Sequence, residues 1–180
     1  MKTAVYPGSF DPFTFGHFDI ACRALDTLDN VIILIANNET KKSLFTEEEK
    51  FNIIVSYFDL SNELKFSLGV DTNIRIHIFN GLLIDYVEEQ SIEEPIIVKG
   101  LRSSSDFEYE KIMANTNYEI SSNTLETIIF MANPSMDIIS SSAVRTLASN
   151  GYRDLSPTFV NEYTNEKLKE KFKKGEINGK

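Results

Sequence analysis

Short apolar runs alternate with longer amphipathic segments along this 180-residue chain. The run at residues 31–36 (Val-Ile-Ile-Leu-Ile-Ala) is continuously apolar, which is typical of a strand buried on both faces of a sheet. Residues 75–79 alternate between apolar and polar side chains. Together these runs predict strands at residues 2–6, 31–36, 75–79, 95–98 and 127–131.

Apolar positions three and four residues apart predict helices after the strands. The second helix opens with Thr46-Glu47-Glu48-Glu49, a capping-box sequence. Helices are predicted at residues 16–28, 46–60, 82–90, 106–119 and 142–149, and a last one begins at Ser156-Pro157, where serine caps and proline takes the first helical position. The first apolar stripe is Phe18, Ala21, Cys22, Leu25 and Leu28, and the second is Phe51, Ile54, Val55 and Phe58.

This alternation predicts an α/β fold with a Rossmann-like, doubly wound, parallel five-stranded sheet. We expect a single domain over residues 1–180, with a C-terminal helix and a Lys-rich tail from about residue 165. In such folds ligands bind beyond the carboxyl ends of the strands. Functional residues are therefore expected in the loops at residues 7–17, 37–45, 80–83, 99–105 and 132–142.

Composition narrows the class of protein. The 42% hydrophobic and 25% charged fractions are ordinary for a globular protein, and no apolar run is long enough for a membrane helix. A formal net charge of −9 disfavours broad nucleic-acid binding. The N-terminus lacks a signal-peptide core because Pro7 and Gly8 interrupt it. Cys22 is the only cysteine, which excludes a disulfide framework and suits a reducing cytoplasm.

The first loop, Tyr6-Pro-Gly-Ser-Phe-Asp-Pro-Phe-Thr-Phe-Gly-His17, carries the densest candidate chemistry. Gly8 permits close backbone approach, and Ser9 offers a hydroxyl and an N–H group at the sheet edge. Gly16 and His17 fall at a helix start, where the dipole and free N–H groups favour anions. A helix-capping loop with a surface histidine remains an equal alternative for His17 alone.

Cations follow two further strands. Lys41 and Lys42 lie in the loop after residues 31–36, where a lysine can contact a phosphate, although such a pair is usually a solvated loop. Lys99 and Arg102 would converge if the chain turned at Gly100, and otherwise they are two surface charges.

Two polar clusters have both a structural and a functional explanation. Asp106 and Glu110 share one helix face, and a pair at that spacing is more often solvated surface than acid–base machinery. The run Ser140-Ser141-Ser142 supplies a helix cap, and it is also a phosphate cradle, with Arg145 one turn further on. His77 is expected on a strand surface and Cys22 in the core.

These motifs resemble a known superfamily. Gly-Ser-Phe-Asp-Pro followed by Thr-x-Gly-His resembles the signature of the nucleotidylyltransferases. Lys41-Lys42 with Phe-Thr-x-Glu-Glu, and Lys99-Gly-Leu-Arg102 with Asp-Phe-Glu-Tyr-Glu, are similar to the phosphopantetheine adenylyltransferase family. The resemblance spans roughly residues 2–170 and keeps the family's motif order.

The resemblance implies transfer of AMP from ATP to 4′-phosphopantetheine, giving dephospho-coenzyme A and pyrophosphate. It also implies a homohexamer, and coenzyme A or dephospho-coenzyme A as a ligand. The acceptor phosphate would attack in line, His17 and Lys41 would stabilise the transition state, and Ser9 would orient the acceptor. Mg²⁺ would accompany ATP on phosphate oxygens and water, without a protein metal site.

The same resemblance implies the contacts of each substrate. Ser9, Lys41, Leu83 and Lys99 would bind the acceptor, although Leu83 is equally expected in the core. ATP would be bound by Ser9, Phe10, His17, Gly100, Leu101, Arg102, Glu110, Met136, Asp137, Ile138, Ile139, Ser140, Ser141 and Ser142.

The chain departs from the family pattern at two site positions. Phe15 stands where a polar residue is usual, and Lys99 replaces the usual arginine, which gives up a bidentate fork. Residues 62–73 and the C-terminal tail are longer than usual. Two alternatives remain: another nucleotidylyltransferase, such as a nicotinamide mononucleotide or glycerol phosphate enzyme, or a nucleotide-binding module without catalysis.

Overall fold

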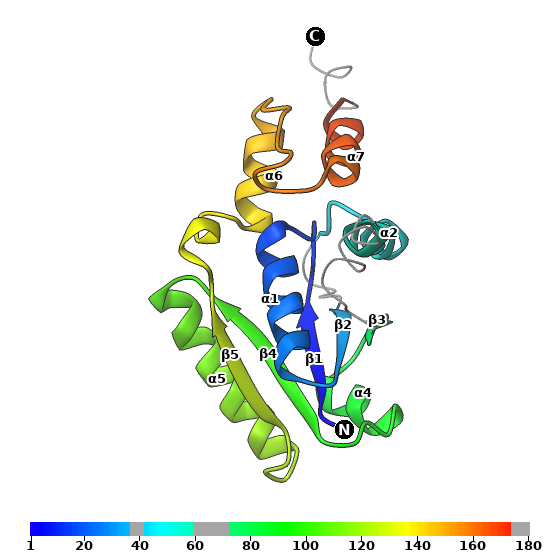
Figure 1. The fold of residues 1–180 in the computed structure, drawn as a ribbon, viewed down its shortest axis with the longest axis vertical. Coiled ribbons are helices and arrows are strands. Elements are labelled where there is room, and N and C mark those ends of the chain that lie inside the picture. Colours follow the sequence, from blue (N-terminus) through cyan, green and yellow to red (C-terminus); the bar gives the residue numbers. More distant parts are fainter. Residues whose placement is uncertain (37–41, 60–72, 174–180) are drawn as a thin grey trace. The chain divides into compact units, whose positions relative to one another are not determined.

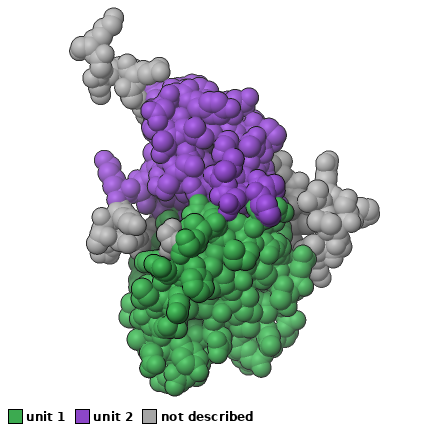
Figure 2. Space-filling model, turned by 90° about the vertical axis from the view of Figure 1, so that its left-hand side faces the viewer, with its two compact units in different colours: residues 1–9, 19–39, 72–133 green, residues 10–18, 40–71, 134–180 purple. Residues whose placement is uncertain are grey.

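The computed structural model describes residues 1–36, 42–59 and 73–173. The chain divides into two compact units (Figure 2). Unit 1 comprises Met1–Ser9, Asp19–Glu39 and Thr72–Asn133, and unit 2 comprises Phe10–Phe18, Thr40–Asp71 and Pro134–Lys180. The expectation of a single domain over residues 1–180 stays a prediction.

Unit 1 is built on a five-stranded parallel sheet (Figure 1). Its strands are β1 (Thr3–Gly8), β2 (Asn30–Ala36), β3 (Ile74–Phe79), β4 (Pro95–Leu101) and β5 (Glu126–Met131). Their order is β3-β2-β1-β4-β5, and every neighbouring pair is parallel. The order changes direction after β3, as in a doubly wound sheet, so the predicted Rossmann-like fold is confirmed.

Helices cover the two faces of this sheet (Figure 1). Helix α1 (Phe15–Thr27) lies across one face, and α4 (Leu83–Glu89) and α5 (Ser104–Ile120) lie across the other. Successive strand residues point to opposite faces, so each strand contributes to both interfaces. Toward α4 the core consists of Val5, Ile32, Leu34, Ile97 and Leu125 with Tyr86 and Val87. Such two-sided burial explains why residues 31–36 are continuously apolar.

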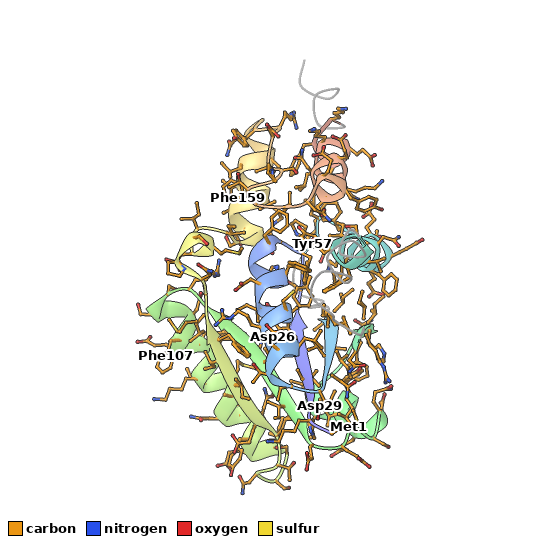
Figure 3. All side chains as sticks on the ribbon, viewed as in Figure 1. Met1, Asp26, Asp29, Tyr57, Phe107 and Phe159 are labelled. Carbon is orange, nitrogen blue, oxygen red and sulfur yellow. The ribbon has the colours of Figure 1, made fainter. Side chains whose placement is uncertain are left out.

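Unit 2 holds α2 (Glu47–Asp59), a 3-10 turn (Pro134–Met136), α6 (Ser141–Ser149) and α7 (Glu162–Lys173). The capping box of α2 is confirmed, because the Thr46 N–H donates to Glu49 Oε2 at 2.8 Å and the Glu49 N–H donates to Thr46 Oγ1 at 3.2 Å. Tyr57, labelled in Figure 3, packs against the rings of Phe13, Phe15 and Phe18.

The boundary of the last helix differs from the prediction. Helix α7 begins at Glu162 and not at Ser156-Pro157. Its cap is the buried Asn161, whose Oδ1 accepts from the Thr164 N–H at 2.9 Å. Ser-Pro is equally common in turns, and residues 156–159 form a turn here.

Two predicted apolar stripes are shifted around their helices. Helix α1 buries Ile20, Ala21 and Ala24, and Leu28 directly after it is also buried, while Cys22 and Leu25 are half-buried. Helix α2 buries Lys50, Ile53, Ile54 and Tyr57, whereas Phe51 is exposed. About half of the positions in each helix are apolar or aromatic, so periodicity alone left the orientation of each helix open by about one residue.

Among the described residues, no helix combines the length and the apolar composition that a membrane crossing requires.

Candidate active site

The candidate catalytic histidine is part of the cap of α1. The Thr14 side chain accepts from the His17 N–H at 3.4 Å, and the Thr14 N–H donates to His17 Nδ1 at 3.1 Å. This is the reciprocal arrangement of a capping box, with histidine in the place usually held by Glu or Gln. The capping expected as an alternative for His17 is therefore present, and it engages Nδ1 of the ring.

The cap also determines the state of the imidazole. A nitrogen that accepts from a backbone N–H must carry a lone pair, so the neutral His17 ring bears its proton on Nε2. Nε2–H is then a donor group at a helix start, where the dipole favours anions. Such a group can donate a hydrogen bond to a phosphate oxygen.

Aromatic packing fixes the plane of the His17 ring. Phe10 meets it edge-on with centroids 5.2 Å apart, and Phe13 lies 5.4 Å away. Phe10 has a φ of 45°, a left-handed conformation that is uncommon for a non-glycine residue, and its ring is almost fully buried. Phe10 therefore belongs to the packing around His17.

The serine run (residues 140–142) lies beside the loop that carries His17 (residues 10–17), called the histidine loop below. Ser140 caps α6, accepting from the Ala143 N–H at 3.0 Å, and Ser141 Oγ donates to the Pro12 carbonyl at 2.8 Å. A Cβ added to Gly16 would lie 3.4 Å from the Ile139 carbonyl oxygen. The starts of α1 and α6 therefore adjoin, and both present helix N-terminal N–H groups.

Arg145 and Ser142 complete this corner. Arg145 Nη1 donates to the Asp11 carbonyl, and Nη2 lies 3.3 Å from Ser142 Oγ. Arg145 thus links α6 to the histidine loop. Of the other predicted ATP contacts here, Met136 is half-buried, Asp137 and Ile138 are exposed and Ile139 is buried. The side chain of Ile139 therefore belongs to the packing.

Residues 44 and 45, at the end of the loop that follows β2, are held by the loop at residues 10–17. The buried Asp11 carboxylate accepts from the Leu44 and Phe45 N–H groups, each at 2.9 Å. Lys42 is exposed, and Lys41 lies outside the described residues. In unit 2 the loop at residues 10–17 therefore contacts Leu44 and Phe45 through Asp11 and the serine run through Pro12.

The other predicted site residues belong to unit 1. Gly100 and Leu101 belong to β4, so the chain does not turn at Gly100. Lys99 and Arg102 pair with successive turns of α5: Lys99 Nζ lies 3.4 Å from Glu110 Oε2, and Arg102 Nε lies 3.3 Å from Asp106 Oδ2. The two carboxylates share one helix face as expected, and each receives a cation from β4 or the residue after it.

Gly100 is required for close packing between β4 and α1. A Cβ at this position would lie 2.9 Å from Ile20 Cγ1 and 3.2 Å from Ile20 Cδ1. Lys99 points to the opposite face, where its Nζ also donates to the Pro7 carbonyl at 3.4 Å. Ser9 follows β1 and is exposed, and Leu83 starts α4 and is packed against the core.

Phe15, a departure from the family pattern, does not disturb the histidine. Its ring meets Tyr57 at 5.4 Å in an edge-on contact, and its N–H donates to the Phe159 carbonyl at 3.1 Å. The substituted side chain therefore enters the aromatic cluster around Tyr57. The bonds between Thr14 and His17 involve only the backbone and side chains of those two residues.

Sequence reasoning missed Thr14, Asp11 and Lys50. Thr14 carried a local signal, because threonine three residues before His17 is the spacing of a capping box. Asp11 and Lys50 gave no such signal, since their partners lie elsewhere in the chain or are backbone groups.

Comparison with known proteins places the chain in the class of nucleotidyltransferases. Residues 5–147 match the family described as cytidylyltransferase-like. Among solved structures, a bifunctional NMN adenylyltransferase/ADP ribose pyrophosphatase from Francisella tularensis has a TM-score of 0.64 at 16% identity and covers 97% of this chain and 53% of that one. Plasmodium falciparum nicotinic acid mononucleotide adenylyltransferase has a TM-score of 0.64 at 15% identity and covers 94% and 96%. These likenesses show the fold.

Relatives define the family more narrowly. Phosphopantetheine adenylyltransferase of Carboxydothermus hydrogenoformans is 41% identical over 174 residues, covering 97% of this chain and 98% of the relative. That of Clostridium perfringens is 42% identical over 149 residues, 83% of each chain. The chain belongs to the phosphopantetheine adenylyltransferase family, within the cytidylyltransferase-like nucleotidyltransferases.

Proposed function

We propose that this chain transfers the adenylyl group of ATP to 4′-phosphopantetheine, giving dephospho-coenzyme A and pyrophosphate. The observation that carries this is the His17 ring, held by the Thr14 N–H at Nδ1 so that its proton lies on Nε2, beside the serine corner (residues 140–142) at the start of α6. The family relationship at about 40% identity supports the choice of acceptor.

The reaction needs placement of two anions more than acid–base chemistry. An oxygen of the acceptor phosphate forms a bond to the α-phosphorus of ATP, and the bond from that phosphorus to the β-bridging oxygen breaks, so pyrophosphate leaves with the electron pair. The acceptor is already ionised, so no strong base is required. His17 Nε2–H and Lys41 stabilise charge on the α-phosphate in this proposal.

The remaining residues have binding roles in the proposal. Ser9, Leu83 and Lys99 hold the acceptor. The serine corner at residues 140–142 holds the triphosphate through hydroxyl and helix N-terminal N–H groups. Gly100, Leu101, Arg102 and Glu110 contact ATP.

Mg²⁺ fits this chemistry as a companion of ATP. It would neutralise phosphate charge, and it usually keeps several waters and substrate oxygens as ligands. In the part of the chain that the structure describes, no three His, Cys, Asp or Glu side chains form a group that could hold a metal. The proposal therefore assigns Mg²⁺ to the triphosphate. Chelation by excess EDTA should abolish pyrophosphate release, and excess Mg²⁺ should restore it.

A substrate panel tests the acceptor. Pyrophosphate release from ATP is measured with 4′-phosphopantetheine, nicotinamide mononucleotide, glycerol 3-phosphate or no acceptor. The proposal expects release with 4′-phosphopantetheine and formation of dephospho-coenzyme A. Release with another acceptor alone would assign the chain to a different nucleotidyltransferase reaction.

Two variants separate the chemical role of His17 from its cap. His17→Gln keeps a side chain that can accept from the Thr14 N–H in a capping box, whereas His17→Ala removes both functions. Both should lose roughly 10²- to 10³-fold in kcat. Only His17→Ala should also lose about 1 kcal/mol of stability. Near-normal turnover by His17→Ala contradicts the proposed role.

A further inference from the structure

Asp11 is buried at the centre of unit 2 and has no role in the reaction proposed above. Its side chain is 9% exposed. Oδ2 accepts from the Leu44 N–H and Oδ1 from the Phe45 N–H, each at 2.9 Å, so both carboxylate oxygens bind consecutive backbone amides. A carboxylate bonded to backbone N–H groups is one of the stronger kinds of hydrogen bond in proteins.

Lys50 holds the same segment from the side of α2. Lysine is rarely buried, yet Lys50 is 1% exposed, and its Nζ donates to Ser43 Oγ at 3.0 Å. Burial lowers the pKa of Lys50, and the charges of Asp11 and Glu47 oppose this effect. A buried ammonium is retained where an opposite charge and hydrogen bonds compensate it.

Three consecutive residues are therefore fixed by two buried charges of opposite sign. Ser43 is bound by Lys50, and Leu44 and Phe45 are bound by Asp11. The Phe45 ring is 1% exposed, so the end of this segment is also packed. These three residues begin two positions after Lys41, the proposed catalytic lysine. The Asp11 carbonyl also accepts from Arg145, so Asp11 contacts α6 as well.

We propose that Asp11 and Lys50 are positioning residues for adenylyl transfer: they fix residues 43–45 against the loop at residues 10–17 and so hold the backbone next to Lys42. The inference rests on the proposed function. Neither residue touches substrate in it. Their effect is on placement, where an error of about 1 Å can cost roughly 10²-fold in rate.

The test uses Asp11→Asn, Lys50→Met and Lys50→Arg in the full chain. Asp11→Asn keeps one acceptor oxygen of similar shape and loses the charge and one amide partner. Asp29→Asn is the matched control, because exposed Asp29 accepts the Lys2 N–H outside this segment. For each variant we would measure thermal unfolding, kcat and KM for both substrates, and amide hydrogen exchange at Leu44 and Phe45.

The proposal expects Asp11→Asn and Lys50→Met to lower kcat by roughly 10- to 100-fold while folded, with smaller changes in KM for ATP. Amide exchange at Leu44 and Phe45 should accelerate in Asp11→Asn. Lys50→Arg keeps the positive charge, so its kcat should be much closer to the wild type than that of Lys50→Met. Asp29→Asn should match the wild type. A merely structural role would lower the unfolding temperature and leave kcat within twofold, and that result overturns the proposal.

Failure of the proposed function looks different. A wild-type chain that releases no pyrophosphate with 4′-phosphopantetheine overturns the proposed reaction. In that case amide exchange at Leu44 and Phe45 still tests whether Asp11 fixes these residues. Unchanged exchange in Asp11→Asn would show that it does not.

Discussion

Two half-buried side chains, Cys22 and His77, have ionisation equilibria that burial shifts in measurable directions. Cys22 lies on α1 and is the only cysteine. His77 lies on β3, where its Nδ1 is 2.7 Å from the Tyr86 hydroxyl. His77 is therefore more than the strand-surface histidine that the sequence predicted, because it packs edge-on against Tyr86.

Cys22 should react slowly in the native protein. Burial raises the pKa of its thiol to about 11, and the nearby carboxylates of Asp26 and Asp19 act in the same direction. Only the thiolate is nucleophilic, so labelling by a thiol reagent at pH 8 should be roughly 10²-fold slower in the folded than in the urea-unfolded chain. Equal rates for the two states would contradict this.

His77 should make stability depend on pH. Burial, and then the Arg75 charge, lower the pKa of His77 below its ordinary value of 6.5. The unfolded chain then binds the proton more readily, so this contribution is complete above about pH 6.5 and is lost as pH falls toward the folded pKa. Urea unfolding between pH 5.5 and 7.5 should show a shallower pH slope for His77→Gln than for the wild type. Identical slopes would show that His77 does not contribute.

At the scale of single residues, the sequence predicted roles that depend on neighbouring residues, but not contacts between residues far apart in the chain. The sequence predicted His17 and the three serines, because a helix start and its cap are local features. It did not predict Asp11, whose partners are the backbone amides of residues 44 and 45. Backbone groups have no sequence signature, and burial of Lys50 depends on the tertiary structure.

The contact between β4 and α1 depends on the absence of a side chain at Gly100. Alanine there would place Cβ 2.9 Å from Ile20 Cγ1, and Ile20 is buried. Gly100→Ala should therefore cost about 1–3 kcal/mol in chemical unfolding. Combined with Ile20→Ala, which removes the clashing atoms, the double variant should be more stable than the sum of the two single losses predicts. Strict additivity would count against direct contact.

The corrected start of α7 gives a second prediction among the elements. Asn161 is buried and caps α7, because its Oδ1 accepts from the Thr164 N–H. Its Nδ2 donates to Ser56 Oγ at 2.9 Å. Asn161→Ala should cost about 2 kcal/mol, and Ser156→Ala less than about 0.5 kcal/mol. Thermal and urea unfolding of both variants would measure this. A larger loss for Ser156→Ala would favour the helix start that the sequence suggested.

Element types were predictable because the apolar runs and helical periods are strong. The strand at residues 31–36 needed no information beyond its own composition. Boundaries were weaker where two local signals competed: Ser156-Pro157 favours both a helix start and a turn, and Gly100 favours both a turn and close packing. In each case the tertiary environment, and not the local sequence, decided the result.

At the scale of the molecule, α5 carries exposed apolar side chains that a second copy could cover. Tyr109 and Ile112 are 62% and 64% exposed, and Phe107, labelled in Figure 3, is 47% exposed. Exposed apolar groups of this size often mark interfaces. We therefore propose that the expected homohexamer forms partly through α5. Cytoplasmic location likewise stays a prediction.

Sizing in solution tests the assembly. With a chain mass of 20.5 kDa, a wild-type hexamer should elute at about 120 kDa. Ile112→Glu should shift it to smaller species, because a carboxylate cannot be buried unpaired. Lys111→Glu, an exposed position on the same helix, is the control for added negative charge. Elution of the wild type as a monomer would show that the hexamer prediction is wrong.

Lys99 has a limited capacity for new bonds. An ammonium has three N–H groups, and here one donates to the Pro7 carbonyl while Glu110 attracts another. A phosphate that engages more than one N–H must therefore replace a partner that the protein already supplies. Binding of a phosphate to Lys99 therefore exchanges one acceptor for another, so the net gain in free energy is smaller than that of a newly formed ion pair. The gain also depends on the free energy needed to break the contact between Lys99 and Glu110.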